Sequence, residues 1–573
     1  GYTFGKHTLR FGVDFVHNYD IQNNLFQSNG SYSYASVGLY LADILKPSGA
    51  CGALTASGTP SLTTAGGYGC HSGLTQGFGP QVFDLATLDS SFFVQDDWKV
   101  TPSLTVNIGA RYDIETYPGP FTSALNSAVP QEANHPSDKN NISPRIGFAW
   151  DPFGKGKAVI RGGYGIYYGR IINASLMSAY TTTGGAGGQL QLTAFNGTNL
   201  GTTAAPQYIK FPQTLSARPT GGNFGVLYLD KNLQNPYTHQ FDLTIQQDLG
   251  WRNVLSVSYI GSLSRELPNY LNLNLDPNKT YNVTYTLAAN SAAPGNCLVA
   301  ACGTTFTQKV YSARSTVSGS NTLNAAYNQI TPLISNVNAS YHALTVDITN
   351  RQSKLISYDV NYTWAHALDY GPSSSTSFSP GNNWIDPYNA RANYGNSNIN
   401  VPHRLVGWAN FNIPGRHGDT GLGYLTNGWS IKPLVQIQKG LPYSVGTSSG
   451  SPSNQTGCTD CLQPYSTGVA GTGVASYIPF FGRNQLFGPR NIVIDTRLQK
   501  DFRIREGMSF QLMAEAFNLA NHRNITGVNA GAFSLANNTL TATTNFGTPS
   551  TSGVNGNYAY QVRQFQFSGR IVF

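Results

Sequence analysis

The sequence predicts an all-β protein, a transmembrane antiparallel up-and-down β-barrel with short periplasmic turns and long extracellular loops. Three observations predict this fold. The composition is rich in Gly and aromatic residues but poor in charge, apolar side chains alternate with period two, and connections alternate between short and long. The alternation pattern identifies about 14 strands, and the visible part of the barrel is expected to hold about 14–16.

The composition excludes several classes of protein. Charged residues make up 11% of the 573 residues, against about 25% in an average soluble domain, while aromatic residues make up 12%. Helix-forming residues are scarce, and no run approaches the ~20 apolar residues that a spanning helix needs. Coiled coils, helical bundles and most α/β enzymes are therefore excluded. The net charge is +8, but the basic residues are scattered along the chain without a cluster, so no nucleic-acid partner is expected.

Period-two alternation predicts each strand in turn. In residues 103–113, for example, one face is apolar and the other polar, as a strand between lipid and water requires. Many segments are longer than an ordinary globular strand and suit a tilted membrane crossing of roughly 9–11 residues. In chain order, the predicted strands lie at 8–20, 89–99, 103–116, 143–151, 157–169, 236–249, 253–263, 339–351, 356–367, 402–413, 429–439, 489–500, 507–519 and 562–573.

The connections between these strands alternate in length. Long links lie at 21–88, 117–142, 170–235, 264–338, 368–401, 440–488 and 520–561. The links between them are short, although the one at 414–428 is somewhat longer. A barrel with one rim of turns and one rim of loops produces this order, whereas a propeller or a solenoid would show a fixed repeat.

Three stretches resemble parts of the barrel of TonB-dependent outer-membrane receptors, in particular the Oar-like subgroup. Residues 92–113 resemble the family's aromatic-x-Gln-Asp-x-Trp strand, Thr-Pro turn and Gly-x-Arg-Tyr strand. Residues 143–168 resemble the Pro-Arg-x-Gly hairpin that follows, and residues 510–521 resemble the penultimate strand. The resemblance covers most of the chain, from about residue 85 to Phe573.

The resemblance implies that residues 1–573 are the outer-membrane barrel domain, the C-terminal part of a larger receptor whose N-terminal plug is missing from this sequence. It implies a place in the outer membrane of a Gram-negative bacterium, in contact with lipid and lipopolysaccharide. TonB would be reached only through the missing N-terminal region. The expected function is TonB-dependent uptake of a large or scarce nutrient, an unknown extracellular substrate such as a peptide, a glycan or proteinaceous cargo. A passive porin and a surface adhesion or binding protein are the alternatives.

The polar faces of the strands are expected to line the barrel interior, where they would border a water-filled path or hold a plug. Mutual pairing of these charges is an equally good interpretation. The lumen-facing candidates are Arg111, Asp113, Asp347, Asp495, Arg497 and Glu515.

The six cysteines form three local pairs, each within a long link, which predicts loop disulfides made in an oxidising compartment. The pairs are Cys51 with Cys70, Cys297 with Cys302, and Cys458 with Cys461. Zinc or redox chemistry is the alternative for the C-x-x-C of the last pair, which has no second ligand pair beside it.

The last predicted strand places Phe565, Phe567, Ile571 and the terminal Phe573 on one face. This pattern resembles the signature that barrel-assembly machinery recognises, although an ordinary terminal strand is the alternative. An enzyme is not expected, and neither is a cofactor. Residues 446–450 match the letters of G-x-S-x-G, but they are expected to form a flexible loop without a strand-turn-helix context.

Overall fold

The structure is a computed structural model of the chain. It describes residues 1–573 except 46–50, 52–68, 197–199, 201–207, 219–222, 279, 312–322, 325, 328, 352–354, 372–383, 385, 416–420, 450–477, 479–480, 537 and 551–561.

A meander of fourteen long strands forms the main sheet. Each strand pairs antiparallel with the next one along the meander, in the register that alternating faces require. All fourteen coincide with predicted segments. They are β2 (His7–Asn23), β5 (Val82–Thr101), β6 (Leu104–Thr116), β7 (Ile142–Trp150), β8 (Ala158–Tyr168), β11 (Tyr237–Gly250), β12 (Asn253–Tyr270), β15 (Gln329–Asn350), β16 (Ile356–Asp369), β18 (His403–Asn412), β19 (Trp429–Gln438), β23 (Asn491–Arg505), β24 (Met508–Phe517) and β27 (Gln564–Val572).

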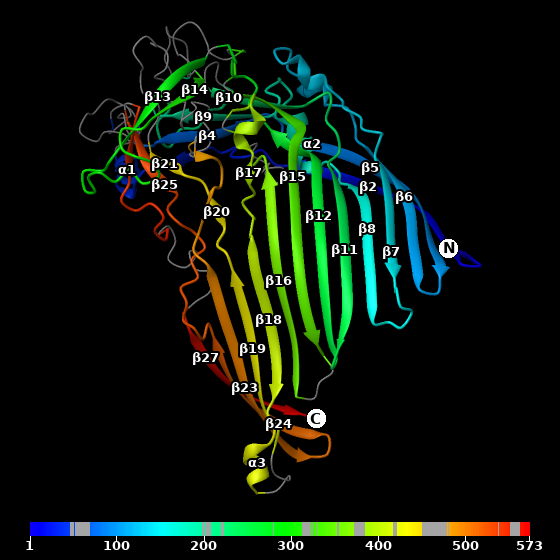
Figure 1. Ribbon diagram of the computed structural model, residues 1–573. Helices are drawn as coiled ribbons and strands as arrows, with labels where there is room; N and C mark the ends of the chain where they lie inside the picture. The colour runs from blue at the N-terminus through cyan, green and yellow to red at the C-terminus, as the bar shows by residue number, and fades with distance from the viewer. Residues whose placement is uncertain are drawn as a thin grey trace.

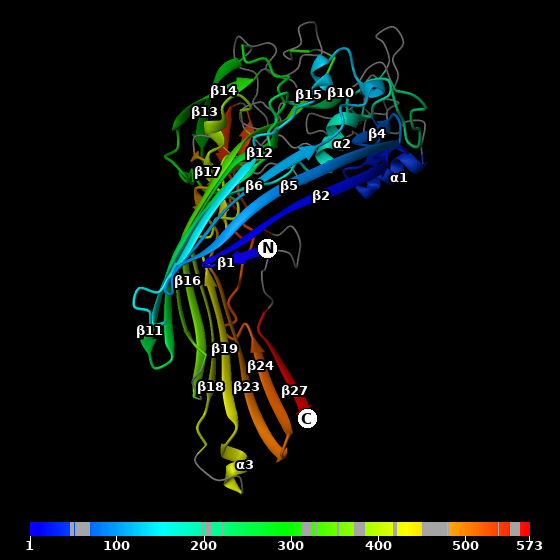
Figure 2. The ribbon, with the colours of Figure 1, turned by 90° about the vertical axis from the view of Figure 1, so that its right-hand side faces the viewer.

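The sheet is a curved wall that remains open along one side. Figure 1 shows the strands side by side, and Figure 2 shows the curvature and the gap between the two ends of the chain. Within the described residues, β27 pairs with β24 alone, and β2 pairs with β5 and the short β1 (Tyr2–Phe4). The observed wall is therefore the partial antiparallel barrel that the sequence predicts.

The two faces of the wall differ in chemistry. Large apolar side chains stand exposed on the convex face, and they include Phe11, Phe92, Ile108, Ile146 and Leu243. The concave face carries polar side chains, among them the Arg111 guanidinium, which donates to the Ser91 hydroxyl at 2.8 Å. Lipid on one side and water on the other require this arrangement.

Several strands are longer at the loop end than the sequence predicts. β5 begins at Val82 instead of residue 89, β12 ends at Tyr270 instead of 263, and β15 begins at Gln329 instead of 339. The alternation fails there because the concave face becomes apolar. Phe83 and Leu85 point inward on β5 and are buried, so both faces carry apolar residues and no period of two remains.

The described residues of the long links form a layer across the loop end of the wall, at the top of Figure 1. β10 (Asn223–Leu229) extends the sheet by pairing parallel with β15, and β9 (Leu190–Phe195) bridges β10 and β4 (Gly73–Phe78), which also pairs with β3 (Ser31–Ser33). A separate sheet joins β14 (Thr305–Tyr311), β13 (Thr280–Ala288), β26 (Thr539–Ala542), β25 (Gly531–Ala536) and β21 (Gly446–Ser449). The expectation of a flexible loop at 446–450 is thus wrong for residues 446–449, because pairing with β25 makes them a strand.

The remaining elements are short. β16 pairs with β17 (Gly395–Asn396), and β20 (Pro442–Tyr443) pairs with β22 (Leu486–Phe487). The helices are α1 (Val37–Leu45), α2 (Asn173–Thr181) and α3 (Leu422–Thr426), with 3-10 turns η1 (Thr122–Ala124), η2 (Pro130–Ala133) and η3 (Ala390–Asn393). None of the described helices combines the length and apolarity of a membrane span.

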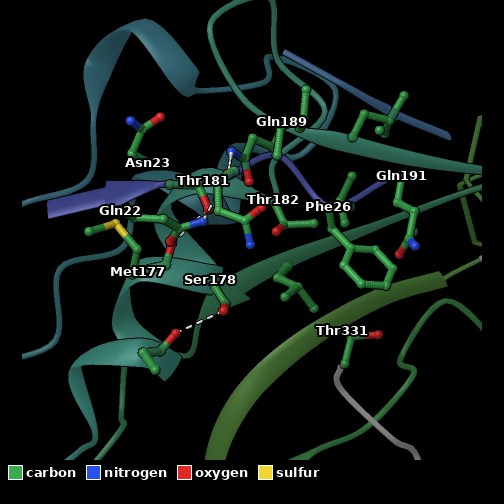
Figure 3. Close-up of a pocket in the computed structure, with 18 of the residues that line it drawn as sticks. Gln22, Asn23, Phe26, Met177, Ser178, Thr181, Thr182, Gln189, Gln191 and Thr331 are labelled. Atoms are coloured by element: carbon green, nitrogen blue, oxygen red, sulfur yellow. Dashed lines mark hydrogen bonds between the residues drawn. The ribbon is translucent and has the colours of Figure 1, made fainter. Parts of the chain in front are cut away.

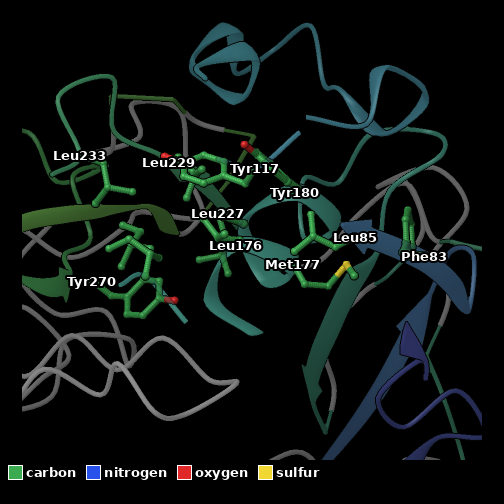
Figure 4. Close-up of a cluster of buried hydrophobic side chains, with 13 residues drawn as sticks. Phe83, Leu85, Tyr117, Leu176, Met177, Tyr180, Leu227, Leu229, Leu233 and Tyr270 are labelled. Atoms are coloured by element: carbon green, nitrogen blue, oxygen red, sulfur yellow. The ribbon is translucent and has the colours of Figure 1, made fainter. Parts of the chain in front are cut away.

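A hydrophobic cluster fastens the layer to the wall, and Figure 4 shows it. Helix α2 contributes Leu176, Met177 and Tyr180, which pack with Leu85 of β5 and Leu227 of β10. Full burial of one such side chain contributes about 1.5–3 kcal/mol, so α2 is held firmly on the concave face. This anchoring positions the cavity described below.

Candidate functional site

The concave face pairs its predicted charges with one another. Arg111 Nε lies 2.8 Å from Asp113 Oδ1, and Arg497 Nη2 lies 2.7 Å from Glu515 Oε1. The two pairs lie on different strands, β6 and β23–β24, and do not form a single site.

The other two lumen-facing candidates lie on the same face. The Asp495 carboxylate accepts a hydrogen bond from the backbone N–H of Asn518 at 2.8 Å. Asp347 stands opposite Asn361 in the β15–β16 ladder. The polar face is therefore a network of local contacts along the wall, and its role in lining a path remains a prediction.

Two of the three predicted cysteine pairs lie in the described residues, and both are disulfides. Cys51 bonds to Cys70, 19 residues later, and Cys297 bonds to Cys302, 5 residues later. Cys51 and Cys70 are buried with Leu39 of α1. The Cys458 and Cys461 pair lies outside the described residues.

Reduction should loosen the loops and leave the wall intact. A local disulfide contributes about 2–3 kcal/mol at most, and the strands hydrogen-bond independently of these rings. Hydrogen exchange with and without reductant should show faster exchange around residues 69–73 and unchanged exchange in β11 and β12. Loss of protection throughout the wall would contradict this expectation.

β27 places its aromatic side chains on the convex face. Phe565, Phe567 and Ile571 are exposed there, and Phe573 follows the end of the strand. The inward positions of the same strand carry Gln564, Gln566 and Arg570. The outward aromatic row therefore exists in the structure, while its recognition by assembly machinery stays a prediction.

A cavity of about 1060 Å³ lies where the upper end of β2 meets helix α2. Figure 3 shows this cavity with α2 on one side and the strands of the loop layer around it. It is bordered by the upper end of β2 and the residues after it, by α2 and the segment leading into β9, and by β9, β10 and β15. Its polar lining includes Asp20, Gln22, Asn23, Asn24, Asn173, Ser178, Thr181, Thr182, Gln189, Gln191, Thr193, Gln329 and Thr331.

Hydrogen bonds fix part of this lining. Gln189 Nε2 donates to the carbonyl oxygens of Asn24 at 2.9 Å and Pro80 at 2.8 Å. Asn173 donates to the carboxylate of Asp20. The hydroxyls of Ser178 and Thr181 donate to carbonyls within α2, at 2.8 and 2.9 Å. These hydrogen bonds hold one side of the cavity in place before any ligand binds.

Other side chains of the lining are available. Among the described residues, no hydrogen bond is formed by the side chains of Asn23, Gln191 or Thr331. Phe26 stands at the cavity with 59% of its surface exposed. Asp20 is the one ionisable residue among the described residues of the lining. The cavity can therefore offer neutral donors, neutral acceptors and an aromatic ring.

Sequence reasoning missed this cavity. Apart from Asp20, its residues come from the links at 21–88, 170–235 and 264–338, which the sequence predicts only as loops. The run Gln22-Asn23-Asn24 and the pair Gln189 and Gln191 were the visible signals. No local pattern indicates that such distant segments meet.

A smaller hollow of about 440 Å³ lies along the wall itself, across β6, β7, β8 and β11. Gly109, Gly147, Gly163 and Gly165 lie in it, and Arg145 stacks over the Tyr167 ring at 4.4 Å. The absence of side chains at these glycines makes the wall thin at this place.

Glu132 of η2 is a buried carboxyl in the loop layer. Its Oε2 accepts a hydrogen bond from the backbone N–H of Asn126 at 2.9 Å. Burial raises the pKa of this carboxyl to about 8, and the hydrogen bond lowers the pKa in part.

This raised pKa predicts a pH-dependent loop. Between pH 4.5 and about 8, the folded segment keeps a proton that the unfolded segment releases, so the segment loses stability as the pH rises. We expect amide protection of residues 122–133, corrected for intrinsic exchange, to fall over this window. Glu132→Gln should remove the dependence. Protection that increases with pH would contradict the assignment.

Comparison with known proteins adds the following findings. A family model described as an outer membrane beta barrel domain matches residues 1–566. No curated protein matches the chain. The fold is similar to that of the outer membrane transporter YddB from Escherichia coli, with 12% identity and a TM-score of 0.46, covering 100% of this chain and 52% of that one.

Two further solved structures are similar. For the ferric enterobactin receptor PfeA from Pseudomonas aeruginosa, the identity is 11%, the TM-score is 0.44, and 99% of this chain and 51% of that one are covered. For the FrpB iron transporter from Neisseria meningitidis, the identity is 8%, the TM-score is 0.42, and the coverage is 91% and 49%. The chain thus spans about half the length of these proteins.

Proposed function

Because the chain belongs to the family of outer membrane beta barrel domains, we propose that it forms the barrel of a receptor that imports a large or scarce nutrient with the help of TonB. The protein is located in the outer membrane of a Gram-negative bacterium. The ordered loop layer with its cavity carries the proposal, because a capture site at the outer rim is what an active importer needs. The polar concave face supports the proposal, because it provides a hydrophilic surface beneath the cavity.

We further propose that residues 1–573 act as one part of a longer receptor, whose plug and TonB contact lie elsewhere in that protein. The inward charges, such as the Arg497–Glu515 pair, would then border the plug. Detection of a larger polypeptide in outer-membrane fractions, with an antibody against these residues, tests this organisation. A band of the size of this chain alone would overturn it.

Depletion of nutrients from a complex medium tests the function. Strains with and without the gene, each with and without functional TonB, are grown on the same medium, and the remaining solutes are quantified by mass spectrometry. We expect at least one solute to persist in the medium when either gene is lost. Depletion that continues without TonB would favour a passive porin, and unchanged depletion with weakened surface attachment would favour an adhesion protein.

The convex face has two proposed partners. The exposed apolar belt would contact outer-membrane lipid and lipopolysaccharide, and the aromatic row of β27 would contact the barrel-assembly machinery. Phe567→Ser should lower the amount of folded protein in the outer membrane several-fold. Phe153→Ser, in the turn after β7, is the matched control, and equal loss in both variants would contradict a specific role of β27.

A further inference from the structure

We propose that the cavity between β2 and α2 binds a neutral oligosaccharide. This proposal rests on the proposed function, because the sugar would be the imported nutrient. The cavity has Asp20 as the one ionisable residue of its described lining, is rich in side-chain amides and hydroxyls, and has an exposed aromatic ring beside it. Each of these properties matches one property of a sugar chain.

The charge of the lining argues against ionic ligands. Asp20 is the one ionisable group among the described lining residues, and its carboxylate already accepts a hydrogen bond from Asn173. An anionic chelate would lose its hydration on entry and meet only the like charge of Asp20, and a peptide with several charges would find a partner for at most one of them. A neutral ligand does not suffer this loss.

The hydrogen-bonding groups match hydroxyl ligands. A side-chain amide offers donors and an acceptor together, and a sugar hydroxyl likewise both donates and accepts. Gln191, Asn23 and Thr331 have these groups available among the described contacts of the cavity. Gln189 adds an amide oxygen whose orientation is fixed by its two donated hydrogen bonds.

Phe26 supplies an apolar surface for the ligand. The ring is 59% exposed and borders the polar lining, so an apolar face is open to a ligand there. Sugar rings present C–H groups on their faces and hydroxyls on their edges, so a ring stacked on Phe26 leaves its hydroxyls directed at the amides. Peptides do not combine a flat apolar face with a dense hydroxyl rim in this way.

The size and rigidity of the cavity favour several sugar units. About 1060 Å³ lies just above the ~300–1,000 Å³ range of small-molecule sites. Helix α2 is anchored by the buried cluster with Leu85 and Leu227, so that side of the site is ordered before binding. Preorganisation of this kind reduces the entropy cost of binding.

Calorimetric titration of the purified protein in detergent tests the inference. The probes are maltoheptaose, cellohexaose and xylohexaose, with a neutral alanine-rich peptide and a ferric catecholate chelate as the competing classes. We expect binding of at least one oligosaccharide. Phe26→Ala should weaken this binding about tenfold, and Gln191→Ala about fivefold.

Matched variants separate binding from folding. Phe153→Ala and Gln131→Ala change equally exposed residues away from the cavity and should leave binding unchanged. Thr331→Val keeps the shape of a buried residue and replaces its hydroxyl by a methyl group, so a loss of binding in a variant with the parent's circular dichroism reflects the lost hydroxyl. Binding of none of the sugars, binding insensitive to all three cavity variants, or Phe26-dependent binding of the peptide or chelate alone would each overturn the inference.

This experiment is independent of TonB and of transport. Sugar binding at the cavity without TonB-dependent depletion would reject the proposed function and keep the inference. TonB-dependent import of another solute without sugar binding would reject the inference and keep the function.

Discussion

Ile108→Arg is expected to lower the free energy of unfolding in a lipid bilayer by roughly 2–4 kcal/mol. Ile108 is 50% exposed on the convex face of β6, directly opposite Ile146 of β7. In a membrane these side chains contact hydrocarbon, where a guanidinium loses its hydration. Val346→Arg on β15 should have an effect of the same sign, because Val346 lies on the apolar face of its strand. Urea titration of protein refolded into phosphatidylcholine vesicles measures the change.

Asn107→Arg is the matched control one residue away. Asn107 points to the concave face, where its neighbour across the ladder is Gly147, so a long cation reaches water. We expect the free energy of unfolding of this variant to stay within about 0.5 kcal/mol of the parent value. Equal destabilisation by both substitutions would mean that the two faces do not separate lipid from water, and the barrel assignment would fail.

Arg483→Met is expected to lower the stability of the loop layer by about 3–5 kcal/mol, the largest loss expected there. Arg483 is only 5% exposed. Its guanidinium donates to the backbone oxygens of Asn393 and Asp369, each at 2.7 Å, and pairs with the Asp369 carboxylate. Methionine keeps an unbranched apolar side chain but leaves Asp369 and two carbonyls without these donors. Hydrogen exchange of residues 390–396 should therefore accelerate strongly.

Arg351→Met tests whether burial causes this effect. Arg351 pairs with Asp359 at 2.7 Å, but its side chain is 70% exposed. Water replaces the lost partner at such a site, so we expect the free energy of unfolding to change by less than about 1 kcal/mol. A comparable loss in both variants would show that burial does not decide the contribution of these ion pairs.

The wall could be predicted from the sequence because lipid imposes its pattern residue by residue. In β6, the alternation of Ile108 and Asn107 is set by the two solvents on either side of one strand. Neither tertiary contacts nor the length of the links is needed to recognise it. Most of the fourteen long strands follow this pattern, although β18 and β19 place Trp408 and Leu434 on the inward face.

The loop layer could not be predicted in the same way. Phe83 and Leu85 break the alternation because α2, from a link about ninety residues later, covers the concave face at their height. Gly446–Ser449 becomes a strand only because β25 lies beside it. The cavity depends on such meetings, and only the amide-rich runs near Gln22 and Gln189 gave a trace of it in the sequence.

The cluster beneath α2 also dictates an order of folding. Phe83, Leu176, Leu227 and Leu333 come from four separate parts of the chain, so they meet only after the intervening strands have paired. Closing such large loops costs chain entropy that a few apolar contacts cannot offset on their own. We therefore expect the wall to assemble first and the cavity beside α2 to form last, after the strands have crossed the membrane. Burial of the α2 cluster in a slow phase, later than the recovery of β-structure, is the kinetic signature of this sequence of events.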